Sequence, residues 1–289
     1  MKGILLSGGL GTRLFPLTTV IGKQLLPIFD KPMIFYSLST LIHAGVDDVL
    51  IITTSDDLEK YRLLFNSGRH LGINIEYAIQ NSPEGIPQAI LIAESFLNGE
   101  SFWLMLGDNM AHGPQFGRYL KNSLTNSMGA KAFAYHVQTP ELFGVVTFDK
   151  KTDKILSLEE KPLAPDSNWA LIGLYHFDPT AISKTLSLKP SPRGELEIID
   201  LLKLYFEERN LEITKISRGN AWFDLGTPKS ILKAAVYVES VQSIQGQLVG
   251  SPEEASLNAG LITKDQAEKS LERYTHTEYF KTLKYCLLQ

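Results

Sequence analysis

The hydrophobic positions in the N-terminal part of the chain form short continuous runs, separated by stretches with helical spacing. The runs predict strands over residues 2–7, 48–54, 73–79 and 101–107, the first two of them buried. Between them, the spacing predicts helices over 32–45 and 86–97. Continuously apolar strands that alternate with helices are typical of a parallel sheet covered on both faces. We therefore predict an α/β fold with a mostly parallel, Rossmann-like sheet and helices on both faces.

In the middle of the chain the apolar runs are joined by shorter connections. Strands are predicted over 130–137, 144–149, 154–160 and 170–177, as antiparallel additions to the sheet. A helix over 195–209 and a strand over 211–217 follow. From Pro228 onward the pattern is helical to the end, with breaks around Gly246–Pro252 and at Gly260. This last part is predicted to be a small helical appendage.

The composition narrows the classes of ligand and partner. The 289 residues are 44% hydrophobic, which is enough for a sizeable core, and the formal net charge is −4. This balance argues against a general nucleic-acid or anionic-membrane surface, because such surfaces carry an excess of basic residues. Any anionic ligand must therefore be bound by a local cluster of lysine and arginine.

The cysteine content and the N-terminus indicate a cytoplasmic protein without a membrane partner. Cys286 is the only cysteine, so no internal disulfide can form, as is usual in a reducing compartment. The apolar run before Gly8 is too short for a signal peptide. No run approaches the roughly 20 residues that a membrane span needs.

A glycine-rich loop follows the first predicted strand. It contains Gly8, Gly9 and Gly11 and continues into Thr12 and Arg13. Because glycine has no Cβ, such a loop lets main-chain N–H groups approach phosphate oxygens, and the arginine adds positive charge. The spacing fits neither a Walker A loop nor the complete dinucleotide-binding fingerprint, which requires a third glycine. Taken alone, the loop is also compatible with a tight structural turn whose charges are solvated.

Further motifs extend this signature along the chain. They are Gly8–Thr18, Lys23–Ile28, Lys31–Ile34, Gln80–Gly85, Gly107–Asn109, Phe143–Val146, Glu159–Pro162, Arg193–Ile198, Ala221–Asp224 and Pro252–Glu254. Together they resemble the sugar nucleotidyltransferase family, most closely its glucose-1-phosphate thymidylyltransferase branch, over essentially the whole chain. The resemblance implies a Mg²⁺-dependent enzyme that joins dTTP to glucose 1-phosphate, giving dTDP-glucose and pyrophosphate. It also implies a place in nucleotide-sugar biosynthesis, such as the dTDP-rhamnose pathway.

The chemistry of that reaction agrees with the residues present. The nucleophile is a phosphate oxygen, which is already ionised near neutral pH because the second pKa of phosphate is about 6. No general base is required, and the sequence contains no recognisable Ser/His/Asp or Cys/His constellation. Positioning and neutralisation of negative charge should supply most of the catalysis during in-line attack on the α-phosphorus.

The resemblance gives catalytic roles to charged residues. Asp108 and Asp224 would hold Mg²⁺, which prefers few protein ligands, and Arg13 and Lys23 would bind the triphosphate and the leaving pyrophosphate. The nucleotide-binding positions implied are Leu6, Gly8, Gly9, Gly11, Thr12, Arg13, Lys23, Gln24, Gln80, Pro83, Gly85 and Asp108. Among these, Gln80 and Gly85 match positions that read the base, since an amide can pair with an imide edge.

A second set of positions matches the sugar-phosphate site of the family. It consists of Gly144, Glu160, Lys161, Ile172 and Arg193. Lys161 and Arg193 would bind the phosphate, and Gly144 would let the sugar lie against the main chain. Because side chains alternate along a strand, Glu160 and Lys161 should point to opposite sides unless the strand bends.

The resemblance also implies a domain organisation and an oligomeric state. Residues 1–227 would form the nucleotidyltransferase core, with a nucleotide-binding part over about 1–110 and a sugar-phosphate-binding part over about 111–227. Residues 228–289 would form a helical C-terminal region that takes part in subunit contacts. The family commonly forms homotetramers.

Some positions near the expected site depart from the family pattern. Leu10 stands where a small residue is usual, Pro87 replaces alanine, and Ile172 and Leu225 each replace threonine. These departures leave open the choice between dTTP and UTP, whose bases differ by one methyl group, and the choice of sugar phosphate. A non-catalytic sensor of nucleotide sugars is an alternative of a different class. It is disfavoured because the charged residues of the site are all present.

Overall fold

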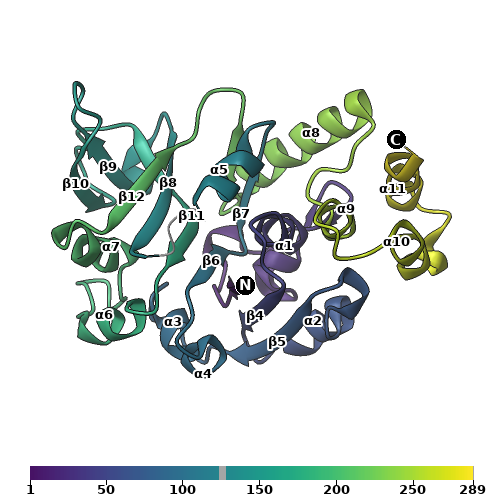
Figure 1. The fold of residues 1–289 in the computed structure, drawn as a ribbon, viewed down its shortest axis with the longest axis horizontal. Coiled ribbons are helices and arrows are strands. Elements are labelled where there is room, and N and C mark those ends of the chain that lie inside the picture. The colour runs from purple at the N-terminus through teal and green to yellow at the C-terminus, as the bar shows by residue number, and fades with distance from the viewer. Residues whose placement is uncertain (124–127, 289) are drawn as a thin grey trace.

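A nine-stranded mixed sheet runs through the centre of the molecule (Figure 1). The computed structural model describes residues 1–123 and 128–288. Along the sheet the order is β10-β9-β11-β6-β1-β4-β5, with β8 paired to β11 and β12 paired to β8. The strands are β1 (Lys2–Ser7), β4 (Asp48–Thr53), β5 (Asn74–Ile79), β6 (Phe102–Leu106), β8 (Ala130–His136), β9 (Gly144–Phe148), β10 (Ile155–Glu160), β11 (Trp169–Phe177) and β12 (Leu211–Lys215).

The direction of the strands confirms the two halves predicted from the hydrophobic pattern. Strands β1, β4, β5 and β6 run parallel, whereas β11 is antiparallel to β6, β8 and β9, and β10 is antiparallel to β9. The parallel half brings the carboxyl ends of its strands to one edge, where ligands bind in open α/β sheets. The C-terminal strand β12 is an exception to the antiparallel half, because it runs parallel to β8.

Helices cover both faces of the sheet. They are α1 (Ile34–His43), α2 (Leu58–Phe65), α3 (Gln88–Ile92), α4 (Glu94–Leu97), α5 (Phe116–Ser123), α6 (Ala181–Ser187) and α7 (Ile198–Glu207). The neighbours Ile4 and Leu5 of β1 show why both faces need cover. Both are fully buried, but Leu5 packs in a core with α1, whereas Ile4 packs in another with α3 and α7. Alternating side chains of one apolar strand thus supply two cores.

The prediction of one continuous helix over 86–97 is wrong. Two short helices occupy this stretch, and Ala93 lies between them with φ −85° and ψ 0°. The ψ of Ala93 departs from the α-helical value while the apolar periodicity continues, so the break has no signal in the hydrophobic pattern.

The C-terminal region is helical, with the predicted breaks around Gly246–Pro252 and at Gly260 and one unpredicted break between Ser270 and Glu278. Its helices are α8 (Pro228–Gln245), α9 (Pro252–Asn258), α10 (Lys264–Ser270) and α11 (Glu278–Leu288). Thr227 caps α8 through a capping box, and Gly246 ends it in the left-handed conformation. Helix α9 packs on α1, while α10 and α11 lie farther out (Figure 1). No helix among the described residues is long and apolar enough to cross a membrane.

Two small ribbons were not predicted. Strand β7 (Asn109–His112) pairs antiparallel with β13 (Ala221–Asp224), and β2 (Pro27–Ile28) pairs with β3 (Lys31–Pro32). The long loop expected before residue 30 is structured by short 3-10 turns at Thr12–Leu14, Leu17–Thr19 and Lys23–Leu25. Further turns of this kind lie at Arg69–Leu71, Pro140–Leu142 and Glu272–Tyr274. Such short elements have little periodicity, and the β7–β13 pairing joins segments far apart in the chain.

Candidate active site

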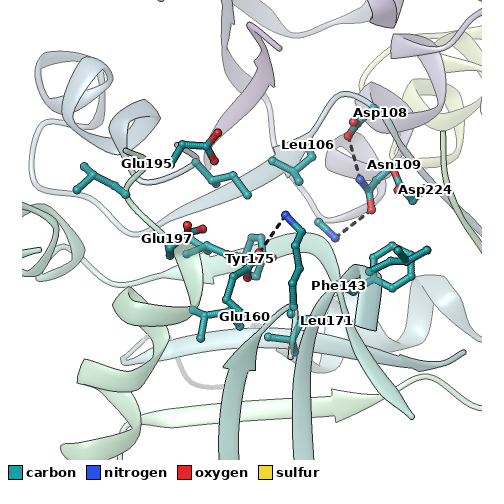
Figure 2. Close-up of a pocket in the computed structure, with 18 of the residues that line it drawn as sticks. Leu106, Asp108, Asn109, Phe143, Glu160, Leu171, Tyr175, Glu195, Glu197 and Asp224 are labelled. Carbon is teal, nitrogen blue, oxygen red and sulfur yellow. Dashed lines mark hydrogen bonds and ion pairs between the residues drawn. The ribbon is translucent and has the colours of Figure 1, made fainter. Parts of the chain in front are cut away.

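A cavity of about 200 Å³ lies where the loops after several strands converge. Figure 2 shows Asp108 and Asp224 on one side of it and Glu160 and Glu197 on another. Its lining draws on the end of β6, on β9, β10 and β11, on the loop before α7 and on β13. The cavity therefore lies between the parallel and antiparallel halves of the molecule.

The β7–β13 ribbon brings the two predicted metal ligands together. Asp224 lies opposite Asn109 in the ribbon, and the Leu225 amide donates to the Asp108 main-chain oxygen at 2.9 Å. Asp108 follows β6 at the carboxyl edge of the parallel strands, so the ribbon fixes Asp224 beside that edge. Both residues line the cavity.

The two carboxyl groups differ in their electrostatic surroundings. Burial raises the pKa of Asp224, and the nearby Asp108 carboxylate raises it further. Burial acts in the same direction on Asp108, but its ion pair with Lys23 and a hydrogen bond from Asn109 outweigh it, so the pKa of Asp108 is lowered. Two close carboxylates repel one another, and a cation between them would relieve that repulsion.

Asn109 holds this arrangement in place, although the sequence reasoning did not single it out as a site residue. Its Nδ2 donates to Asp108 Oδ1 at 3.0 Å. Its Oδ1 accepts from the Gly173 amide at 3.0 Å and from Trp222 Nε1 at 2.8 Å. One buried amide therefore joins β7, β11 and β13 at the cavity. Its position directly after Asp108 was the one sequence feature that could have indicated a role in the site.

The glycine-rich loop lies at the carboxyl end of β1. Gly11 has φ 61°, and an added Cβ would lie 2.8 Å from the Thr18 side chain. Thr18 Oγ1 in turn donates to the Gly11 oxygen at 3.0 Å. Arg13 is largely exposed, with Nη2 3.9 Å from Asp224 Oδ2. Leu10, which stands where a small residue is usual in the family, has a side chain that is 63% exposed.

The positions matched to base reading pack against the loop and against the opposite half of the site. A Cβ on Gly8 would lie 2.1 Å from Gln80 Oε1, so the amide of Gln80 rests on the main chain of Gly8. Gly85 has φ 104°, and a Cβ there would lie 2.1 Å from the Leu196 oxygen. The segment that carries Gln80 and Gly85 therefore touches the segment that carries Arg193.

The expected nucleotide-binding residues are only partly gathered at the cavity. Arg13 and Asp108 line it, whereas the others do not. Those others are Leu6, Gly8, Gly9, Gly11, Thr12, Lys23, Gln24, Gln80, Pro83 and Gly85. Lys23 reaches the site through its ion pair with Asp108. Gln24 is buried, and a Cβ on Gly107 would lie 3.0 Å from Gln24 Cγ.

The sugar-phosphate positions form a charged cluster on the other side. Arg193 makes a two-pronged ion pair with Glu197, in which Nε donates to Oε1 at 3.1 Å and Nη2 donates to Oε2 at 2.8 Å. Glu160 Oε1 lies 3.2 Å from Lys161 Nζ and 3.6 Å from Arg193 Nη2. Although burial opposes it, these carboxylates raise the pKa of Arg193.

The main chain bends after β10, which resolves the question of the Glu160 and Lys161 directions. Lys161 has φ 42°, a conformation that strand residues do not adopt. The bend lets both side chains line the cavity. Gly144 lies beside them, and a Cβ there would come 2.8 Å from Ile199 Cδ1. The space that a side chain at Gly144 would need is therefore taken by Ile199.

Ile172 is placed differently from the other predicted site residues. Its side chain is buried in the core, whereas the lining comes from its strand neighbours Leu171 and Gly173. Alternation along β11 explains this, because neighbouring residues face opposite sides. Only the main chain of Ile172 can belong to the site. Leu225, the departure next to Asp224, is likewise fully buried.

Comparisons with known proteins agree with this fold and site. The Nucleotidyl transferase family model matches residues 2–241. A glucose-1-phosphate thymidylyltransferase of Neisseria gonorrhoeae is 45% identical over 282 residues, covering 96% of this chain and 98% of that protein. One of Mycolicibacterium smegmatis is 46% identical over 266 residues, covering 92% of each.

Solved structures give the same picture. A Bacillus anthracis protein assigned as a glucose-1-phosphate thymidylyltransferase matches with a TM-score of 0.76 and 35% identity, covering 82% of this chain and 94% of that one. A UDP-glucose pyrophosphorylase in complex with UDP-glucose shares the fold, with a TM-score of 0.73 and 23% identity over 83% of this chain and 98% of that one. The chain belongs to the nucleotidyl transferase family and, within it, to the glucose-1-phosphate thymidylyltransferases. The family predicted from the motifs and the fold predicted from the hydrophobic pattern are both confirmed.

Proposed function

We propose that this protein catalyses the Mg²⁺-dependent transfer of a thymidylyl group from dTTP to glucose 1-phosphate, forming dTDP-glucose and releasing pyrophosphate. The observation that carries the proposal is the β7–β13 ribbon. It places Asp108 and Asp224 beside a cavity whose other side presents Glu160, Lys161 and Arg193. A pair of carboxylates that faces the two cations Lys161 and Arg193 suits the joining of two phosphates.

The nucleotide side of the site would act by positioning and charge. The loop glycines would let main-chain N–H groups contact the triphosphate, and Gln80 would pair with the base. Lys23 and Arg13 would neutralise the phosphates at the scissile bond and the departing pyrophosphate. In the structure both cations are held by carboxylates, Lys23 by Asp108 and Arg13 by Asp224. Those ion pairs would loosen when the triphosphate supplies competing oxygens.

The sugar-phosphate side would present the nucleophile. Arg193, oriented by its two-pronged pair with Glu197, and Lys161 would hold the phosphate of the sugar. Glu160 would accept hydrogen bonds from sugar hydroxyls, and Gly144 would allow the ring to lie on the main chain. Among the described residues that line the cavity there is neither histidine nor cysteine, in keeping with an ionised phosphate that needs no general base.

The residues present fit a magnesium ion. The raised pKa of Asp224 beside Asp108 marks a place where a cation would relieve repulsion. The described residues contain no group of three or more histidine, cysteine or acidic side chains that could hold a metal. Two carboxylates completed by phosphate oxygens and water are what Mg²⁺ prefers. When bound, Mg²⁺ would neutralise and align the phosphate oxygens of the two substrates.

The test is pyrophosphate release by the purified protein with Mg²⁺ and glucose 1-phosphate, comparing dTTP, UTP, CTP, ATP and GTP. We expect release with dTTP, lost in Asp108→Asn. Preference for UTP would move the assignment to a uridylyltransferase. If no triphosphate gives pyrophosphate release but a nucleotide sugar binds measurably, a sensor of nucleotide sugars would be favoured instead.

The organisation of the protein is part of the same proposal. Residues 1–227 would form the catalytic core and residues 228–289 a C-terminal region that contributes to a homotetramer in the cytoplasm. The free thiol of Cys286 supports a reducing compartment. Sedimentation at assay concentration tests the tetramer, and a stable monomer would contradict it.

A further inference from the structure

The hydrogen-bond partners of Gln88, on α3, determine which end of its side-chain amide is oxygen and which is nitrogen. Its Oε1 accepts from the main-chain N–H of Glu84 at 3.2 Å, and its Nε2 donates to Glu84 Oε2 at 3.0 Å. A main-chain N–H can only donate, and an ionised carboxylate can only accept. The usual ambiguity between the oxygen and nitrogen of a glutamine amide is therefore removed here.

The fixed amide of Gln88 in turn orients Gln80. Gln80 Nε2 donates to Gln88 Oε1, so the amide nitrogen of Gln80 must face Gln88. The Oε1 of Gln80 then lies against Gly8, where no Cβ interferes. No hydrogen-bond partner for that oxygen is found in the part of the chain that the structure describes. Gln80 is 4% exposed, so it has little freedom to take another direction.

We propose that Gln88 is a positioning residue that selects the base by fixing which way the Gln80 amide points. This rests on the proposed function, in which Gln80 pairs with the base. Thymine and uracil present an N3–H donor between two carbonyl acceptors, whereas cytosine presents an N3 acceptor beside an N4–H donor. Gln80 Oε1, left free by Gln88, accepts from N3–H of thymine. The second hydrogen of Nε2 remains for a thymine carbonyl.

Cytosine meets the opposite pattern at the same edge. Its N3 lone pair would face Gln80 Oε1, and two acceptors cannot pair. To accommodate cytosine, the Gln80 amide would have to turn over, which would place its oxygen against Gln88 Oε1. Gln88 therefore penalises dCTP without touching the nucleotide. It does not distinguish dTTP from dUTP, because the methyl group of thymine is not on that edge.

The experiment measures kcat/KM for dTTP, dUTP and dCTP in the wild type, Gln88→Leu and Gln88→Glu. We expect Gln88→Leu to reduce the dTTP:dCTP ratio about tenfold, the worth of one hydrogen bond, because Gln80 becomes free to turn over. Gln88→Glu is made together with Glu84→Gln, so that the new carboxylate accepts from an amide and does not face a second carboxylate. It keeps an acceptor toward Gln80 and should retain the discrimination. The dTTP:dUTP ratio and the KM for glucose 1-phosphate should stay unchanged in both variants.

Ser82→Ala serves as the matched control, because Ser82 bonds to the other carboxylate oxygen of Glu84, at 2.8 Å, and lies outside the amide chain. Thermal unfolding verifies that each variant folds, and Gln88→Met replaces Gln88→Leu if the latter does not. An unchanged dTTP:dCTP ratio in Gln88→Leu, or an equal loss in Gln88→Glu, would overturn the inference. So would a wild type that uses dCTP as well as dTTP.

The outcome is separable from that of the proposed function. If the wild type forms no product with any triphosphate, the proposed function fails. Calorimetric binding of dTTP and dCTP to the wild type and to Gln88→Leu then decides the role of Gln88 by itself. A change in the dTTP:dCTP affinity ratio would still support that role, and an unchanged ratio would reject it.

Discussion

The amide of Leu225 donates to the main-chain oxygen of Asp108 at 2.9 Å, which locks the two acidic segments of the site in register. Asp224 is held beside Asp108 by main-chain pairing, so its position does not depend on a bound ligand. The two carboxyl groups nevertheless have opposite pKa shifts, because Lys23 pairs with Asp108 alone.

This asymmetry predicts different stability effects for two variants that should both lose activity. Asp108→Asn leaves the nearly buried Lys23 without its counter-charge and should destabilise the protein by about 2 kcal/mol, less than a fully buried pair would. Asp224→Asn removes a repelled carboxylate and should leave the free energy of unfolding unchanged or higher without Mg²⁺. Urea denaturation in EDTA measures both, and equal destabilisation would contradict the electrostatic picture.

The pair between Arg193 and Glu197 predicts a selective effect on the sugar phosphate. Glu197→Ala should raise the KM for glucose 1-phosphate about tenfold, because Arg193 loses the two-pronged contact that orients it. The KM for dTTP should stay within about twofold. Asp200→Asn, on the exposed side of α7 where it pairs with Lys203, is the control. Equal changes in both KM values would argue against a role confined to the sugar phosphate.

Substitution of Gly85 should reduce stability by more than its backbone conformation alone would explain. Gly85→Ala places a Cβ 2.1 Å from the Leu196 oxygen and should destabilise the protein by about 2 kcal/mol or more. The Gly99→Ala control shares the positive φ but meets open space, so it should cost only about 1 kcal/mol. Chemical denaturation of both variants measures the difference. Similar losses would mean that the contact between Gly85 and Leu196 relaxes easily.

His176 predicts a fall in stability on mild acidification. Burial and then the charge of Lys131 lower the pKa of His176 from 6.5 to about 4 in the folded protein. Between pH 6.5 and pH 4, His176 binds a proton in the unfolded chain but stays neutral in the folded protein. Stability should therefore fall as the pH drops from 6.5 to 4, by at most about 3 kcal/mol from this group.

The check is the free energy of unfolding as a function of pH for the wild type and His176→Phe. Phenylalanine keeps the ring packed against Trp103, whose centroid lies 5.2 Å from that of His176. The variant should show a flatter dependence between pH 6.5 and 4. Parallel curves would mean that His176 is protonated in the folded state, or that it opens to solvent at little cost.

The sequence by itself determined the sheet and its cover. Burial on both faces imposes continuous apolar runs on strands such as β1 and β4, so the parallel half could be predicted from local pattern. The end of α8 and the start of α9 could also be predicted, because Gly246 and Pro252 act through their own backbone conformations. The motifs also supplied the identity of the charged residues, although not their arrangement.

Only the tertiary structure decided how those residues meet. The β7–β13 ribbon is too short for a periodic signal, and its two strands lie far apart in the chain. No local pattern therefore predicts that Asp224 lies beside Asp108. The bend at Lys161, the burial of Ile172 and the bridging role of Asn109 likewise depend on which neighbours the fold supplies. Local sequence restricts the backbone of each segment, whereas pairing across the fold sets the distances, and hence the charges and hydrogen bonds, on which the chemistry depends.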